Sequence, residues 1–283
     1  VKEKAWYQAL RPTLVDHKGS AIFISTPKGK NWFYDMFKRG KDEAFTDYAS
    51  FQYSSYDNEY IDKKEIDGMV RDMPQYEYRQ EIMAQFTEDA EAIFLIDNIE
   101  RLKEPVKIKP EGGLKTMGID LGKGFSYTVI VGLQEGTCTR YERFQTSWNE
   151  TIKRIYDIYQ EDQPNFIRID ATGKGDPIVE QLLDAGIPVD SFIFTTTSKK
   201  QLLDKAALAV EKKLIKLPDL SEIYAELEVF GKVKTDSGNE IYKPLKKHSD
   251  DIVMAVSMAI WDMNIDEEIM VEKKVIQYPI IEY

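Results

Sequence analysis

The sequence has few side chains that bind soft metals or cross-link a fold. It contains one cysteine, Cys138, and two histidines, His17 and His248. A lone cysteine excludes an internal disulfide and, with so few histidines, a zinc site built from Cys and His. We therefore expect a protein of a reducing compartment, whose metal ions, if it binds any, take mainly oxygen ligands.

Long hydrophobic runs are also missing. No apolar stretch approaches the roughly 20 residues that span a bilayer, so no membrane partner is expected. Hydrophobic residues make up 42% of the chain and aromatics 12%, which is typical of a folded globular protein. The net charge of −11 is opposite in sign to that of most DNA-binding proteins. Carboxylates gathered around metal ions would contribute to such an excess, and the bound ions would invert its sign locally.

The pattern of apolar and turn residues predicts two domains. The first covers residues 1–96, in which residues 20–25 are expected to form an apolar strand and Trp32 to begin a helix. Residues 97–113, with two prolines and a Gly-Gly pair, are expected to form a linker, and residues 265–283 a tail. The amino terminus lacks an initiator Met and a signal-peptide pattern, which indicates a piece of a longer protein.

Residues 114–264 alternate between strand and helix patterns. Strands are expected at 116–121, 127–133, up to 144, 165–170 and 189–195, and helices at 151–160, 177–185, 199–217, 224–230 and 251–261. Residues 236–239, Asp-Ser-Gly-Asn, predict a hairpin turn. The alternation predicts an α/β fold with a mixed sheet flanked by helices.

Aspartates lie at the ends of these predicted elements. Asp120 and Asp170 each end a strand, and Asp250 and Asp251 begin the last helix. Ligands of open α/β sheets gather at the carboxyl ends of the strands, so these side chains converge if the strands are neighbours. Carboxylates suit Mg²⁺ or Mn²⁺, and two such ions about 3.5–4 Å apart can hydrolyse a phosphodiester.

Each aspartate also has a simpler explanation. An Asp at a strand end is often a turn or cap residue, and Asp250 and Asp251 would stabilise a helix by about 0.3–1 kcal/mol each through its dipole. The ordered combination favours the metal site: a strand ending in Asp, a hairpin, a second such strand, a second hairpin, and His-x-Asp-Asp before an apolar helix.

Lysines lie near the aspartates in the sequence. Lys174 follows Asp170, and the lysines at 243, 246 and 247 precede His248. Positive side chains beside a metal cluster can hold DNA phosphates. The alternative is that Lys243, Lys246 and Lys247 are ordinary solvated residues of a surface hairpin.

Over nearly its whole length the sequence resembles the terminase large subunits of tailed phages. The segment 196–218, Glu226-Leu227 and His248-Ser249-Asp250-Asp251 are similar to that family's nuclease half. The resemblance implies an RNase H-like (integrase/resolvase type) nuclease domain, preceded by a partial α/β segment of the packaging ATPase. It also implies a metal-dependent endonuclease that uses two Mg²⁺ or Mn²⁺ ions to cut concatemeric double-stranded DNA with low sequence specificity. The implied partners are the small terminase subunit and the capsid portal, in the cytoplasm of the bacterial host.

By this resemblance Asp120, Asp170 and Asp251 match the metal-binding triad, and Asp250 a frequent neighbour. His248 matches a histidine that assists the metal in some members. The family's usual Gly-His-Asp-Asp pattern is interrupted here by Ser249, which leaves open how Asp250 and Asp251 divide their duties.

The first domain resembles the end of the family's ATPase. Residues 5–14 are similar to the helix after its acidic catalytic strand, and Ser25, Thr26 and Pro27 to its coupling motif, although Thr-Pro-x-Gly is also an ordinary turn. No Gly-x4-Gly-Lys-Ser/Thr sequence occurs. We therefore expect no productive ATP binding by this chain alone.

Other functions fit parts of the sequence. Residues 117–122, Met-Gly-Ile-Asp-Leu-Gly, resemble the phosphate-binding strand of actin-like ATPases and sugar kinases, but the second Gly-rich loop of those enzymes is missing. A non-catalytic docking module of the packaging motor and a structure-selective resolvase of the same fold are the remaining alternatives.

Overall fold

The computed structural model describes residues 3–15, 18–27, 29, 31–86, 92–103, 110–122, 126–170, 177–235 and 240–265. The chain divides into two compact units, Val1–Ala90 and Glu91–Tyr283. Within the described ranges, every helix is too short or too polar to cross a membrane.

The segment in which we expected the linker to begin is packed into the second unit. Residues Ile96–Ile99 form helix α6 and Glu100–Leu102 form the 3-10 turn η4. The side chains of Ile99 and Leu102 are fully buried, and the Leu102 carbonyl accepts the Leu217 amide at 3.0 Å. The boundary between the units therefore precedes the expected one by several residues.

The first unit consists of short helices and extended segments. Its elements are α1 (Glu3–Ala5), η1 (Trp6–Leu10), α2 (Arg11–Val15), α3 (Trp32–Arg39), η2 (Ser55–Asp57), α4 (Lys63–Val70), α5 (Gln75–Glu77) and η3 (Tyr78–Ile82). The predicted helix at Trp32 is confirmed, and the Asn31 side chain caps it by accepting the Phe33 amide at 2.9 Å.

The predicted strand at residues 20–25 is wrong. This segment is extended, but it belongs to no strand, and Ile22 and Ile24 are 88% and 94% exposed. Only Phe23 packs inward, with its ring 4.6 Å from that of Trp6 and 5.7 Å from that of Trp32. A strand requires a hydrogen-bonded neighbour, and the described part of this unit contains no strand to pair with it.

The second unit contains the predicted mixed sheet. Its strands are β1 (Lys115–Asp120), β2 (Thr128–Gln134), β3 (Thr137–Phe144), β4 (Phe166–Asp170) and β5 (Val189–Phe192), in the order β3-β2-β1-β4-β5. β1 is antiparallel to β2 and parallel to β4, and β5 continues the parallel side. The predicted hairpin of β2 and β3 is confirmed.

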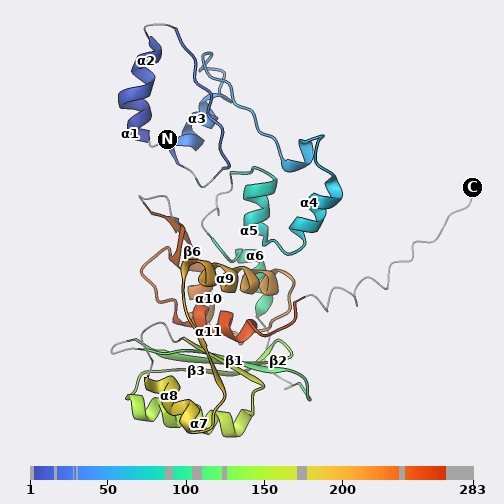
Figure 1. Cartoon of the computed structure of the whole chain (residues 1–283), viewed down its shortest axis with the longest axis vertical. Helices are drawn as coiled ribbons and strands as arrows, with labels where there is room; N and C mark the ends of the chain where they lie inside the picture. Colours follow the sequence, from blue (N-terminus) through green and yellow to red (C-terminus); the bar gives the residue numbers. More distant parts are fainter. Residues whose placement is uncertain are drawn as a thin grey trace, which may run out of the picture. The chain divides into compact units, whose positions relative to one another are not determined.

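Helices cover both faces of this sheet (Figure 1). One face packs against α7 (Trp148–Asp162) and α8 (Pro177–Asp184). On the other face α11 (Asp251–Ile260) lies against β1, β2 and β4, and α9 (Thr196–Glu211) and α10 (Ser221–Val229) pack on α11. A separate hairpin of β6 (Phe230–Lys234) and β7 (Glu240–Pro244) precedes α11. The predicted turn at 236–239 lies outside the described residues.

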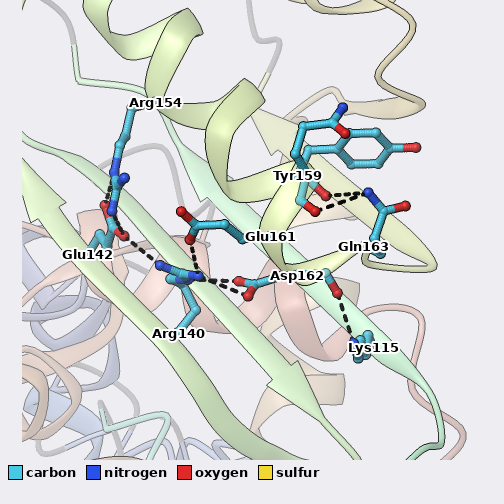
Figure 2. A network of polar contacts seen from close by, with 9 residues as sticks. Lys115, Arg140, Glu142, Arg154, Tyr159, Glu161, Asp162 and Gln163 are labelled. Carbon is cyan, nitrogen blue, oxygen red and sulfur yellow. Dashed lines mark hydrogen bonds and ion pairs between the residues drawn. The ribbon is translucent and has the colours of Figure 1, made fainter.

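A charged network fastens α7 to the edge strand β3 (Figure 2). Arg140 donates to Asp162 at 2.7 Å, to Glu161 at 2.8 Å and to Glu142 at 3.1 Å. Arg154, from α7, reaches the same Glu142. Because only 19% of the Arg140 side chain is exposed, solvent screens these contacts less than it screens ordinary surface ion pairs.

Candidate metal centre

The two central parallel strands bring Asp120 and Asp170 to one edge of the sheet. Ile119 of β1 pairs with Ile169 of β4, so the next residues, both aspartates, are also neighbours. Ile119 and Ile169 belong to the core under α7 and α8. Since side chains alternate along a strand, both aspartates face the opposite side, where α11 lies. Arg168, two residues before Asp170 in β4, also faces this side, because it donates two hydrogen bonds of 2.9 Å to Asp262, just beyond α11.

Helix α11 approaches the sheet closely because β1 carries a glycine beneath it. A Cβ atom at Gly118 would lie 2.5 Å from the Ala259 amide nitrogen, 3.0 Å from the Met258 carbonyl carbon, and nearer still to the Ala255 carbonyl oxygen. Gly118 is therefore the position at which the helix backbone rests on the strand. One turn towards the amino terminus from Ala255 lies Asp251, on the side of Asp120.

The electrostatics of Asp120 show that the predicted aspartates converge. Burial raises the pKa of Asp120 well above its ordinary value, and the charges of Asp251, Asp170 and Asp250 raise it further, in that order. Lys199 acts in the opposite direction. Four carboxylates distant in sequence thus share one electrostatic environment.

The carboxylates do not have the spacing of a metal-coordinating group. Among the residues that the structure describes, no group of three or more His, Cys, Asp and Glu side chains has the spacing of a metal site. The indications of a site are the neighbouring positions of Asp120 and Asp170 on the face of the sheet that carries α11, and the effect of Asp251, Asp170 and Asp250 on the pKa of Asp120.

Lys199 is a member of this cluster that the sequence did not indicate. It lies in the first turn of α9, after the N-cap Thr195, and its ammonium is 3.3 Å from an Asp250 carboxylate oxygen. The Nζ atom is also 5.8 Å from the centre of the Phe230 ring. A cation in an aromatic setting beside four carboxylates offsets part of their repulsion.

Glu226 is the second residue that sequence reasoning missed as part of the site. It comes from α10, is only 5% exposed, and accepts the Ile252 amide of α11 at 2.9 Å. Burial is the main cause that raises its pKa to about 7, and the nearby Asp251 contributes in the same direction. The backbone hydrogen bonds from Ile252 and Val253, together with Arg143, act against the rise.

The remaining predicted site residues lie outside the cluster of aspartates. His248 is exposed, as are Lys243, Lys246 and Lys247, which follow or end β7 on the approach to α11. Lys174 lies outside the described residues. In the first unit Ser25 is exposed and its hydroxyl donates to the Thr26 carbonyl at 3.1 Å, while Pro27 is buried.

Comparison with known proteins shows which proteins this chain is similar to. Residues 2–101 match the family described as the terminase large subunit, T4likevirus-type, N-terminal. The terminase large subunit of Thermus virus P23-45 is 29% identical over 282 residues, which cover 90% of this chain. The chain is thus similar to terminase large subunits over most of its length. It spans 58% of the length of that relative. The large subunit of Escherichia phage T5 is 34% identical over 119 residues, 40% of this chain and 27% of that protein.

Solved structures are similar to this chain in fold. The large terminase nuclease of thermophilic phage G20c, with bound magnesium, aligns with a TM-score of 0.55 and 24% identity. The alignment covers 61% of this chain and 97% of that nuclease. The large terminase of a second thermophilic bacteriophage aligns over 92% of this chain and 66% of its own, with a TM-score of 0.56 and 17% identity. The predicted α/β class, a mixed sheet flanked by helices, is therefore confirmed.

Proposed function

We propose that the second unit is a metal-dependent endonuclease that cleaves double-stranded DNA by two-metal phosphodiester hydrolysis. The observation that carries the proposal is the convergence of Asp120 and Asp170 with the start of α11, in a setting that raises the pKa of Asp120. A cluster of half-buried acidic groups is costly unless a cation compensates it. The all-oxygen donor set fits Mg²⁺ or Mn²⁺.

In this proposal Asp120, Asp170 and Asp251 would hold two divalent ions, with Asp120 as the ligand that both ions share. Bound ions would supply an activated water and stabilise the leaving oxygen. Asp250, paired with Lys199, would adjust the charge around the ions, and His248 would approach them from the exposed loop before α11. The G20c nucleases with bound magnesium and bound cobalt support divalent-ion binding at this fold.

The lysines of the hairpin are the proposed DNA contacts. Lys243, Lys246 and Lys247 are exposed and lead from β7 to the aspartates, so phosphates held there would lie beside the cluster. Lys174 is proposed for the same role from its position after Asp170. Contacts of this kind carry no sequence information, which agrees with low sequence specificity.

The biological setting is also part of the proposal and is inferred from the similarity to terminase large subunits. The nuclease would cut concatemeric DNA in the host cytoplasm, with the small terminase subunit and the capsid portal as partners. The first unit would be the end of the packaging ATPase, with Ser25, Thr26 and Pro27 coupling nucleotide state to movement.

The decisive test is cleavage of supercoiled plasmid by Asp120→Asn. Wild type is expected to produce linear DNA with Mn²⁺ or Mg²⁺ and to stop when a chelator is added. Asp120→Asn should lower the rate by at least about a hundredfold while the protein stays folded, because it removes the shared ligand. Asp184→Asn, on the exposed end of α8 under the other face of the sheet, is the matched control and should cleave like wild type. Wild-type cleavage by Asp120→Asn would refute the assignment.

The alternative functions give different results in the same preparation. An actin-like or sugar-kinase type ATPase would bind nucleotide in calorimetry, and a non-catalytic docking module would bind DNA without cutting it. A structure-selective resolvase would cut branched DNA much faster than linear duplex. Robust ATP hydrolysis by this chain would contradict our expectation that it lacks a working nucleotide site.

A further inference from the structure

The first turn of α11 is capped by residues other than its own aspartates. The first amides of a helix have no partner within the helix, and an Asp at the N-cap usually accepts one of them. Asp250 occupies that position here, but its side chain makes no capping hydrogen bond. The structure therefore departs from the simple interpretation in which Asp250 is an ordinary helix cap.

Each of the first amides of α11 has an acceptor outside the aspartate pair. The Asp251 amide donates to the Ser249 hydroxyl at 3.3 Å. The Ile252 amide donates to the Glu226 carboxylate at 2.9 Å, and the Val253 amide lowers the pKa of the same carboxylate. The acceptors come from the preceding loop and from α10, and none of them is an aspartate of the proposed metal site.

This arrangement has a consequence for the aspartates. A carboxylate that caps a helix has its oxygens directed at backbone amides, so it is a poorer ligand for a cation. Since Glu226 and Ser249 accept hydrogen bonds from the first amides of α11, the carboxylates of Asp250 and Asp251 are not needed to cap the helix. Asp250 is instead paired with Lys199, and Asp251 acts on Asp120.

Burial makes Glu226 suited to hold α11 in place. The residue is 5% exposed, and its carboxylate joins α10 to the end of α11 that faces Asp120. A hydrogen bond from a backbone amide to a buried carboxylate is among the stronger kinds in proteins. Its removal would leave the Ile252 amide of the first turn without this acceptor, and the adjacent residues Asp250 and Asp251 carry carboxylate oxygens that can accept it.

We propose that Glu226 is a positioning residue that caps α11 from the neighbouring helix, assisted by Ser249, and thereby leaves the carboxylates of Asp250 and Asp251 available to the proposed metal site. The inference rests on the proposed nuclease function. It also explains the Ser between His248 and the aspartate pair, because that hydroxyl serves the first amide of the helix.

The test compares Glu226→Ala with Glu226→Gln in the full chain, with Mn²⁺ as the probe. Glu226→Ala should weaken Mn²⁺ binding in calorimetry by about 10- to 100-fold, the range found when a group that orients metal ligands is removed. Cleavage should then need correspondingly more Mn²⁺ and recover towards the wild-type rate at saturation. Glu226→Gln keeps an oxygen acceptor and should stay within about threefold of wild type, a difference no larger than one hydrogen bond accounts for.

Hydrogen exchange supplies a readout that does not depend on cleavage. The amides of Ile252 and Val253 should exchange faster in Glu226→Ala and remain protected in Glu226→Gln. Glu228→Ala is the matched control, since Glu228 lies two residues later in α10 and is exposed. It should leave Mn²⁺ binding and exchange unchanged.

The outcomes separate the two hypotheses. If wild type binds Mn²⁺ but does not cut DNA, the nuclease proposal fails, while calorimetry and exchange still test Glu226. Unchanged Mn²⁺ affinity in Glu226→Ala, or an equal loss in Glu226→Gln, would overturn the positioning role. If Glu226→Ala does not fold, Ser249→Ala replaces it and should weaken Mn²⁺ binding by about threefold, as expected for one hydrogen bond; no change would overturn the proposal.

Discussion

The contact between Gly118 and α11 provides a sharp test of how the site is assembled. Replacing Gly118 by Ala adds one methyl group on the face of β1 that carries Asp120. The new Cβ would lie 2.5 Å from the Ala259 nitrogen, whereas ordinary contact begins at 3.4 Å. The obstacle is helix backbone, which cannot rotate away as a flexible side chain can. The helix must therefore withdraw by at least about 1 Å, the difference between these two distances, because the Ala255 carbonyl oxygen lies nearer still.

Two effects of different size follow. Overpacking of this kind costs about 1–3 kcal/mol, and a unit of this size loses about 2–4 °C in Tm for each kcal/mol. The displacement also moves Asp251 relative to Asp120 and Asp170, and misplacing a reacting group by about 1 Å can cost on the order of a hundredfold in rate. We expect Gly118→Ala to lose much more cleavage activity than its loss of folded protein accounts for.

The assay measures plasmid cleavage with Mn²⁺ and thermal unfolding on the same samples. Gly132→Ala is the matched control, because Gly132 pairs with Met117 and an added Cβ there meets the Arg140 side chain at 3.0 Å rather than α11. It should keep its specific activity. The reasoning is refuted if Gly118→Ala has wild-type cleavage, or if its loss of cleavage equals its loss of folded protein.

Three further predictions follow from the same structure. Because burial raises the pKa of Glu226 from 4.5 to about 7, its contribution to the stability of the metal-free protein is fully present below pH 4.5 and is lost as the pH rises through 7. Urea unfolding should give a lower free energy of unfolding at pH 8 than at pH 5, and Glu226→Gln should reduce this difference by up to about 3 kcal/mol. Equal differences in both proteins would contradict this. Arg140→Met should destabilise the second unit by about 2 kcal/mol, because Asp162 and Glu161 lose their partner and Glu142 keeps only Arg154, while the folded protein cleaves normally. Arg154→Met, whose side chain is 40% exposed, should cost less in the same unfolding assay. Mn²⁺ at about a hundred times its Kd should stabilise wild type by about 2.7 kcal/mol in calorimetry, and the same stabilisation of Asp120→Asn would count against Asp120 as a shared ligand.

The sequence predicted most of the sheet and the residues at its edge, because those features depend on local periodicity. The strands ending at Asp120 and Asp170 carry apolar residues whose alternation is visible in the sequence, and the apolar helix after Asp251 is equally plain. The same kind of pattern failed at residues 20–25. An apolar run reports that a segment suits a strand, but a strand also needs a neighbour, which the sequence of the segment does not reveal.

The amino-acid sequence by itself determined the chemistry available to this protein: oxygen ligands from aspartates, almost no thiol or imidazole, and lysines near the carboxylates. The tertiary structure alone decided which groups support the aspartates. Lys199 and Glu226 lie 52 and 25 positions before Asp251 in helices whose patterns indicate only burial and exposure. Their roles arise because α9 and α10 pack against α11, and contacts between elements distant in the chain leave no periodic trace in the sequence.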